Sequence, residues 1–384
     1  MMTKQAFTGA RIFDGAAWHD RKALVVADGK IEGLIAEDSP TDAIRVPADG
    51  AMIVPGFIDL QVNGGGGALL NDTPTVDAIR TICTAFAQFG TTACLPTIVT
   101  DTVEKNIETI AAGVAAVERG IPGFLGLHLE GPHLAVSRKG AHEASLIRPM
   151  DESDLLRLLE ARKHLPNLLI TVAAETVGPE QISRLTAGGI VVSIGHSDGT
   201  YAQVKAAVEA GASMVTHLFN AQSQIGNREP GVVGSALDLP QISAGLIADG
   251  IHVHPASIGI ALRAKRGPGQ IFLVTDAMSI TGTDWTSFEL TGRTVYRKDG
   301  ALRLGDGTLA GADLTMTAAI RYMHETIGAP LEEVLRMASL YPAMAIRQEA
   351  ERGHLRRGAR ADFVVLDGVL DVRSTWIGGS RAFG

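Results

Sequence analysis

Residues 190–220 read IVVSIGHSDGTYAQVKAAVEAGASMVTHLFN and predict one strand–helix–strand unit. Two apolar runs, Ile190–His196 and Met214–Asn220, flank a segment with helical spacing, Thr200–Ala210, which ends at Gly211. Both runs are largely apolar rather than alternating, which is typical of parallel strands that are buried on both faces. A histidine stands near the carboxyl end of each run, so the unit would bring two imidazoles to the same edge of a sheet.

The same pattern continues on either side of this unit. Six further apolar runs are expected to be strands: Ile53–Gln61, Thr92–Val99, Phe124–Glu130, Leu168–Glu175, Ser243–Asp249 and Ile271–Asp276. Five further segments are expected to be helices: Thr75–Phe89, Thr102–Arg119, Asp151–His164, Gly178–Ala187 and Pro255–Lys265. Eight strand units with helices between them predict an α/β fold, a TIM-type (β/α)8 barrel. A β-hairpin at Ser287–Leu304 and helices at Asp313–Thr326 and Leu331–Leu340 should follow.

The two ends of the chain lie outside this pattern. Both are rich in short β segments, which are Ala6–Phe13, Ala23–Val26, Ile31–Ala36, Asp362–Leu366 and Val372–Ile377. We therefore expect residues 1–54 and 343–384 to form one small β-sandwich domain from both termini. The barrel would then occupy residues 55–342.

The composition limits the classes of protein that this chain can be. With 46% hydrophobic and 20% charged residues among 384, the chain can bury a sizeable core, which excludes a disordered protein. A formal net charge of −8 without a basic stripe indicates neither a nucleic-acid nor a membrane-surface partner. Two cysteines, and an amino terminus (Met1–Lys4) without an apolar signal core, point to a cytoplasmic protein.

Polar side chains stand at the ends of several predicted strands, where the loops of a barrel meet at one mouth. Glu130 ends the third strand, His196 and His217 lie toward the ends of the fifth and sixth, and Asp276 ends the eighth. One carboxylate and two imidazoles, with a fourth position open for water, are the ligand set of a hydrolytic zinc site, and Asp276 would act as the base. The alternatives are core histidines and a capping aspartate, but three such groups would be costly to bury together without partners.

Other polar residues near the same mouth have less specific signals. His128 precedes Glu130 by two residues and faces the same side, which favours a supporting role over ligation. Arg228 and His252 could clamp a phosphate, since arginine offers a bidentate fork; the alternative is a surface arginine and a capping histidine. No nucleophile elbow, P-loop or dinucleotide fingerprint is present, which argues against phosphoryl and hydride transfer. A basic cluster follows the third strand: Arg138, Lys139 and His142.

Five motifs at the strand ends read PGFIDLQ (55–61), HLEGP (128–132), GHS (195–197), HLFNA (217–221) and TDAM (275–278). They resemble the N-acetylglucosamine-6-phosphate deacetylase family, which is part of the amidohydrolase superfamily. The resemblance runs from the N-terminal sheet to the tail. It implies hydrolysis of the acetamide of N-acetylglucosamine 6-phosphate to glucosamine 6-phosphate and acetate, a step of amino-sugar catabolism and cell-wall recycling.

The resemblance also implies roles for individual residues. Glu130, His196 and His217 would hold one divalent metal, with zinc as the first choice. Asp276 would be the general base and acid, and His142 would polarise the acetyl carbonyl. The residues that would contact the substrate are Ala141, His142, Asn220, Ala221, Arg228, His252, Leu309, Ala310 and Gly311. In the family, the phosphate residues often act across a dimer interface, so a homodimer is expected.

The expected metal count depends on residues 61–63. Gln61-Val62-Asn63 stands where many amidohydrolases have His-x-His, and amides are poor ligands beside imidazoles, so one metal is expected. Two features argue against a dihydroorotase or a deaminase. One is this replacement, and the other is a fourth strand that ends Ala173-Ala174-Glu175 without a lysine. Deacetylation of N-acetylgalactosamine 6-phosphate is an open alternative, because the two sugars differ at one hydroxyl. A non-catalytic amidohydrolase-like scaffold is disfavoured by the retained ligand set and base.

Overall fold

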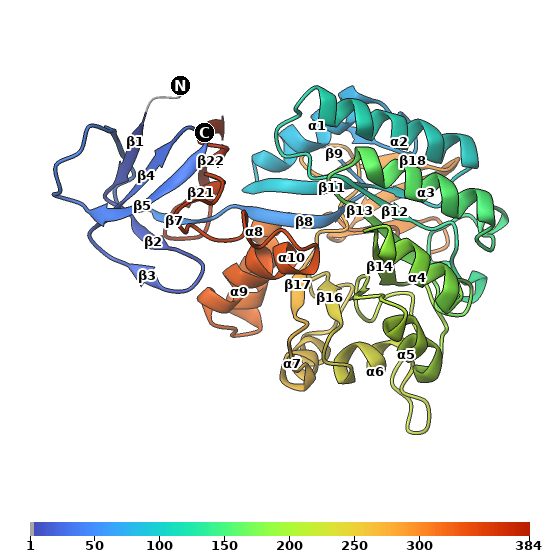
Figure 1. Ribbon diagram of the computed structural model, residues 1–384. Coiled ribbons are helices and arrows are strands. Elements are labelled where there is room, and N and C mark those ends of the chain that lie inside the picture. Colours follow the sequence, from blue (N-terminus) through green and yellow to red (C-terminus); the bar gives the residue numbers. More distant parts are fainter. Residues whose placement is uncertain (1–3) are drawn as a thin grey trace.

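The computed structural model describes residues 4–384. Residues 1–3, which are part of the amino terminus without an apolar signal core, lie outside the described residues. The chain forms a barrel of eight parallel strands with helices around it, and beside the barrel a separate β region built from both termini (Figure 1). The fold class expected from the sequence is confirmed.

The barrel strands neighbour one another in chain order. They are β8 (Phe57–Val62), β11 (Thr91–Val99), β12 (Leu127–Glu130), β13 (Leu168–Val172), β14 (Val191–Ile194), β15 (Met214–Val215), β16 (Ser243–Leu246) and β17 (Ile271–Leu273). Nearly all of their residues are buried, which explains why the sequence shows apolar runs rather than alternation. The first and last strands are joined just beyond β17, where the amide of Asp276 donates to the carbonyl of Gln61 at 3.0 Å.

Most helices follow the strands and cover the outside of the barrel (Figure 1). They are α1 (Val76–Ala87), α2 (Val103–Glu118), α3 (Glu152–His164), α4 (Pro179–Ala187), α5 (Tyr201–Glu209), α6 (Gly231–Asp238), α7 (Pro255–Ala264), α8 (Met316–Arg321), α9 (Leu331–Ala338) and α10 (Leu340–Ala345). The sequence reading missed α6, because two of its eight residues are glycines and its almost complete burial removes the amphipathic pattern. No helix within residues 4–384 is long and apolar enough to span a membrane.

Five of the barrel strands, β13 to β17, end earlier than predicted. The predicted fifth, sixth and eighth strands ran through His196, His217 and Asp276, and these ends were wrong. The three residues have φ angles of 47°, 30° and 51°, which is left-handed backbone and cannot continue an extended strand. The chain therefore turns at the positions of the candidate site residues.

The predicted first strand, Ile53–Gln61, is two strands in two sheets. β7 (Met52–Pro55) belongs to the terminal β region and β8 belongs to the barrel, with Gly56 between them. A Cβ atom on Gly56 would lie 2.1 Å from Oγ1 of Thr92, so only glycine allows the chain to pass so close to the next barrel strand.

The terminal β region consists of two sheets, with strand orders β5-β4-β1-β6 and β23-β22-β21-β7-β2-β3. Their strands are β1 (Gln5–Thr8), β2 (Arg11–Phe13), β3 (Trp18–His19), β4 (Lys22–Ala27), β5 (Lys30–Ala36), β6 (Ile44–Pro47), β21 (Phe363–Leu366), β22 (Val372–Ile377) and β23 (Ser380–Phe383). Phe7 of the first sheet contacts Phe363 and Trp376 of the second, with ring centroids 4.8 Å apart in both pairs. Aromatic side chains from both ends of the sequence thus form the core of this region.

A small sheet lies over the mouth of the barrel. It contains β18 (Ser287–Leu290), β19 (Arg293–Lys298) and β20 (Ala301–Leu304), so the predicted hairpin is present with an additional strand. Its apolar face packs against residues of the barrel loops, including Leu69 and Met278. A short ribbon, β9 (Gly64–Gly65) and β10 (Ala68–Leu69), follows β8.

Candidate active site

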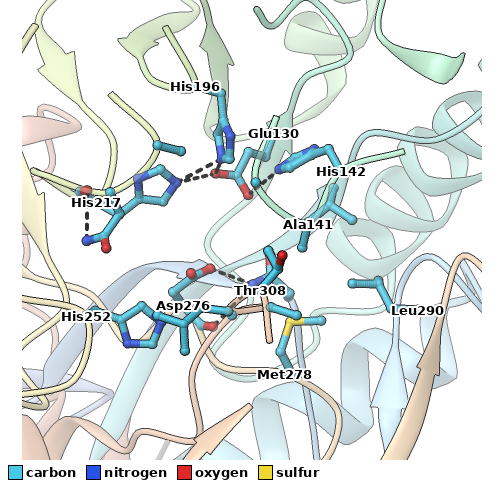
Figure 2. Close-up of a pocket in the computed structure, with 18 of the residues that line it drawn as sticks. Glu130, Ala141, His142, His196, His217, His252, Asp276, Met278, Leu290 and Thr308 are labelled. Carbon is cyan, nitrogen blue, oxygen red and sulfur yellow. Dashed lines mark hydrogen bonds and ion pairs between the residues drawn. The ribbon is translucent and has the colours of Figure 1, made fainter. Parts of the chain in front are cut away.

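A cavity of about 520 Å³ opens at the carboxyl ends of the barrel strands (Figure 2). Every residue for which the sequence suggested a role in metal binding, catalysis or substrate binding lines it, with the exception of Arg228. Seven lining residues were not foreseen, because they belong to no motif and stand in segments without a distinctive pattern: Val99, Ser137, Ile247, Leu290, Arg303, Gly307 and Thr308.

Arg228 lies elsewhere. It belongs to the loop between β15 and α6, which projects from the barrel (Figure 1), and residues 224–229 of this loop are exposed. Ile225 in the same loop is 55% exposed. The structure therefore separates Arg228 from the cavity of its own chain.

Glu130, His196 and His217 converge on one point. Nε2 of His217 lies 2.9 Å from Oε1 of Glu130 and 3.1 Å from Nε2 of His196, and the His196 nitrogen lies 3.3 Å from the same oxygen. Tetrahedral coordination with bonds of about 2.0–2.1 Å places ligand atoms about 3.3 Å apart. The spacing and chemistry of these three donors therefore fit a zinc-like ion.

The surroundings orient these ligands. Nδ1 of His196 donates to the carbonyl of Arg138 at 2.8 Å, which leaves Nε2 as a lone-pair donor toward the site. Burial favours the neutral acid at Glu130, but its contacts with His196 and His217 and their charges outweigh burial and hold the pKa of Glu130 well below its usual value. Burial opposes the cationic form of His217, yet the hydrogen bond and charge of Glu130 prevail and raise its pKa. Nδ1 of His217 is buried without a hydrogen-bond partner among residues 4–384.

Two amides occupy the place next to the carboxylates. Nε2 of Gln61 donates to Oε1 of Glu130 at 3.1 Å and to Oδ1 of Asp276 at 3.0 Å, and Nδ2 of Asn63 donates to the same Asp276 oxygen at 2.7 Å. Amide N–H groups thus supply hydrogen bonds to both carboxyl groups on this side of the site. Burial, reinforced by the charge of Glu130, raises the pKa of Asp276 to about 6.

His142 faces the same point from the loop after β12. The backbone amide of Thr100 donates to Nδ1 of His142 at 3.3 Å, so Nδ1 is an acceptor and Nε2 carries the proton of the neutral ring. Burial, with the nearby His196, lowers the pKa of His142 well below its usual value. Nε2 lies 3.8 Å from Oε2 of Glu130, and ligand atoms of Glu130, His142 and His196 all lie within 4.8 Å of one another, so His142 is close enough to be a further ligand. Its protonated Nε2 favours a hydrogen-bond donor instead.

His252 lines the cavity from the loop after β16, below His217 in Figure 2. Its Nδ1 lies 2.5 Å from Oδ2 of Asp249, so this nitrogen donates and Nε2 is left for a ligand. The segment Leu309–Gly311 lies against the catalytic strand end, because the amide of Ala312 donates to the carbonyl of Asp276 at 2.8 Å.

The barrel with this site at its mouth belongs to a known family. The pattern of the amidohydrolase family matches residues 52–383, and the chain is a member of that family. Within it, the chain is 41% identical to an N-acetylgalactosamine-6-phosphate deacetylase of Shewanella sp. (strain ANA-3), over 98% of this chain and 95% of that protein.

Two solved structures show the same likeness. N-acetylglucosamine-6-phosphate deacetylase from Pasteurella multocida is 34% identical, with a TM-score of 0.95 over 99% of this chain and 100% of that one. A mutant of the Mycobacterium smegmatis N-acetyl-D-glucosamine-6-phosphate deacetylase, in complex with N-acetyl-D-glucosamine-6-phosphate, is 30% identical, with a TM-score of 0.91 over 100% of this chain and 99% of that one.

Proposed function

We propose that this chain hydrolyses the acetamide of N-acetylglucosamine 6-phosphate to glucosamine 6-phosphate and acetate, as part of amino-sugar catabolism and cell-wall recycling. The observation that carries the proposal is the convergence of Glu130, His196 and His217 beside an amide-tethered Asp276 in one cavity. The solved relative with this sugar phosphate bound supports the choice of substrate.

Glu130, His196 and His217 would hold one divalent ion, and this nitrogen and oxygen donor set favours Zn²⁺. When bound, the ion would polarise the acetyl carbonyl and lower the pKa of water. Gln61 and Asn63 both donate to Oδ1 of Asp276, which leaves Oδ2 to take the proton of the attacking water. The same carboxyl would then give this proton to the departing amine.

The remaining lining residues would bind the substrate. Nε2–H of His142 would donate to the acetyl oxygen as negative charge develops on it. His252 would bind the phosphate through Nε2, together with Arg228 of the partner subunit, because the exposed loop of Arg228 points away from its own cavity. The residues that would contact the sugar and close over it are Ala141, Asn220, Ala221, Leu309, Ala310 and Gly311.

This assignment implies a cytoplasmic homodimer. Its barrel domain would span residues 55–342, and its small domain would combine residues 1–54 with 343–384. The exposed Ile225 beside Arg228 supports an interface at the projecting loop, since an apolar side chain there gains by being covered. The two cysteines are free and buried, which agrees with a reducing compartment.

N-acetylgalactosamine 6-phosphate is a second candidate substrate. The 41% identity to a deacetylase of that sugar exceeds the identity to the two glucosamine-type structures. The epimers differ at the C4 hydroxyl, and Arg303 and Thr308 are polar side chains that line the cavity.

Acetate release from both sugar phosphates and from unphosphorylated N-acetylglucosamine tests the assignment, with metal content measured on the same sample. We expect about one metal per chain and a higher kcat/KM on N-acetylglucosamine 6-phosphate. Preference for the galactosamine epimer would move the assignment to the second candidate. Metal without acetate release from either phosphate would leave an amidohydrolase for another amide.

The phosphate clamp has its own test. Arg228→Ala should raise KM for the phosphorylated sugar by about tenfold to a hundredfold with a smaller change in kcat, since the lost contact is charge-assisted. Equal activity of the wild type on the unphosphorylated sugar would contradict the clamp.

A further inference from the structure

Beneath the proposed metal ligands, a chain of hydroxyl and imidazole groups crosses the interior of the barrel. Oγ of Ser193 lies 2.6 Å from Oγ1 of Thr216, which lies 2.7 Å from Oγ1 of Thr171. The Thr171 oxygen lies 2.8 Å from Nε2 of His128, whose Nδ1 is 3.1 Å from the carbonyl oxygen of Leu60. The four side chains are at most 4% exposed. Branched apolar residues usually fill this part of a barrel, so the polar layer needs an explanation.

The donors and acceptors of this chain can be ordered. A carbonyl oxygen only accepts, so Nδ1 of His128 donates to Leu60 and Nε2 of the neutral ring accepts from Thr171. Thr171 then accepts from Thr216, and Thr216 accepts from Ser193. Each hydroxyl group therefore donates to one defined acceptor. The hydrogen-bonded chain links β8, β12, β13 and β14 to the end of β15.

Each strand that leads to a proposed metal ligand contributes one member of this chain. His128, Ser193 and Thr216 stand two, three and one residues before the ligands Glu130, His196 and His217. Because side chains alternate along a strand, His128 faces the same side as its ligand. Ser193 and Thr216 stand at odd spacings, and their place in the same layer follows from their hydrogen bonds to each other and to Thr171, while the backbone turns at His196 and His217.

The strand that most needs these additional hydrogen bonds is β15. This strand has two residues and two registered pairs with each neighbour, yet it leads to His217. His196 and His217 both have positive φ angles, which are strained for residues other than glycine and persist where the surrounding structure holds them. The hydroxyl chain supplies contacts that the short ladder does not.

Packing around the layer is equally tight. A Cβ atom on Gly195, the residue before the ligand His196, would lie 2.7 Å from Cγ2 of Thr171 and 2.9 Å from Cβ of Thr216. Thr171 and Thr216 therefore enclose the backbone of the strand that carries this ligand. The two threonines thus act on the ends of β12, β14 and β15 both through hydrogen bonds of their hydroxyl groups and through packing of their carbon atoms.

We propose that Thr216, with Thr171 and Ser193, is a positioning residue that sets the spacing of the three metal ligands. The inference rests on the proposed metal site. None of these residues lines the cavity, so they act on the metal only through the backbone of the ligands and through His128.

The test is the affinity of the purified, metal-free protein for Zn²⁺, measured by competition with a chelator of known affinity. Thr216→Val keeps the side-chain shape and removes the central hydroxyl, and we expect metal affinity to fall about tenfold to a hundredfold. Thr216→Ser keeps the hydroxyl and should restore most of the affinity. Thr375→Val is the matched control, because Thr375 is a fully buried threonine in the terminal β region, with no hydrogen-bond partner for its hydroxyl within residues 4–384.

Urea unfolding of the metal-free variants separates positioning from general damage. A Thr216→Val protein that unfolds cooperatively and still binds Zn²⁺ like the wild type would overturn the inference. Should that variant fail to fold, Ser193→Ala removes only the end of the chain, and unchanged affinity there would equally overturn it. A wild type that binds no metal would refute the proposed site itself, whereas equal affinities of wild type and variants refute only the positioning role.

Discussion

Asp276 follows the last barrel strand and is held by two neutral amides. Gln61 and Asn63 both donate to its Oδ1, and burial raises its pKa to about 6. A carboxylate that both takes and returns a proton benefits from a pKa close to the working pH. Gln61 and Asn63 of the Gln-x-Asn sequence therefore tether the proposed base.

The proposed role of Asp276 leads to the first prediction. Asp276→Asn keeps an oxygen for both amides and leaves the metal ligands unchanged, but it cannot accept the water proton. We expect kcat to fall about 10²- to 10⁴-fold while metal content stays near that of the wild type. Steady-state kinetics and metal analysis on one preparation check this. A variant with near-normal turnover would show that another group moves the proton.

At the scale of residues, the sequence indicated which side chains form the candidate site, but it did not predict their strained backbone conformations. Glu130, His196 and His217 could be selected because each stands where an apolar run meets a loop, and the structure brings all three to one cavity. The positive φ angles of His196 and His217 could not be foreseen, because tertiary contacts rather than local preference impose them. Arg303 was missed because a lone arginine in a hairpin resembles a solvated side chain.

At the scale of elements, the sheet over the mouth is connected to the loop that carries His142. Arg293 of β19 donates through Nη2 to the carbonyl of Ala141, and through the same atom to Oγ1 of Thr291 at 3.3 Å. Ala141 directly precedes His142, so this hydrogen bond holds the loop of the proposed carbonyl-polarising residue against the sheet. The sheet thus acts as a support for the site as well as a cover.

Removal of this support gives the second prediction. Arg293→Ala should lower kcat/KM by about tenfold, because a misplaced polarising group loses part of its hydrogen bond in the transition state. Hydrogen exchange of residues 139–142 should become faster. Arg184→Ala is a suitable control, since that arginine pairs with Glu152 on the outside of the barrel. Unchanged exchange and kinetics in Arg293→Ala would contradict the connection.

The start of α3 contains an ionic cluster that stabilises the fold. Asp154 accepts hydrogen bonds from Arg148, from Arg157 at 2.9 Å and from the amide of Asp151 at 3.3 Å. Burial favours the neutral acid, but these donors outweigh it and lower the pKa of Asp154. A depressed carboxyl pKa contributes stability that is present above the unfolded-state value of 3.8 and is lost as pH falls through the folded-state value.

The third prediction follows from the lowered pKa of Asp154. At pH 7, Asp154→Asn should lower the free energy of unfolding by about 2 kcal/mol, the size of a hydrogen bond to a charged group. The difference from the wild type should shrink as the pH falls below 3.8. Urea unfolding of metal-free protein keeps metal release out of the comparison. Glu160→Gln, an exposed carboxylate on the same helix, should have a much smaller effect. If the difference in the free energy of unfolding between the wild type and Asp154→Asn increased at low pH, the stabilising role of the Asp154 carboxylate would be refuted.

Element boundaries were less predictable than element types. The predicted helices Thr102–Arg119 and Thr200–Ala210 begin at threonines that the structure uses as N-caps, so α2 and α5 start one residue later. The change of sheet at Gly56 falls inside the single predicted strand Ile53–Gln61, because only one residue separates β7 from β8. Only the close approach of Thr92 shows why the chain changes sheet there.

At the scale of the whole molecule, the barrel is complete in one chain but the proposed phosphate site is not. The cavity holds His252 and the metal-binding residues, whereas Arg228 stands on an exposed loop beside Ile225. A symmetric dimer that covers this loop would place the arginine of each subunit in the partner's cavity. Sequence could propose both residues for the phosphate, but it could not show that they lie apart in a single chain.

Mixed dimers test this arrangement directly. Arg228→Ala and Asp276→Asn should each be poorly active alone. In a dimer of one subunit of each kind, the Arg228→Ala subunit keeps its own Asp276 and receives an intact arginine from its partner, while the other site carries both defects. Random assembly makes about half of the dimers mixed, with one intact site each, so about a quarter of wild-type activity should return after co-refolding or co-expression. If both residues served the same chain, every site would carry one defect and mixing would restore nothing.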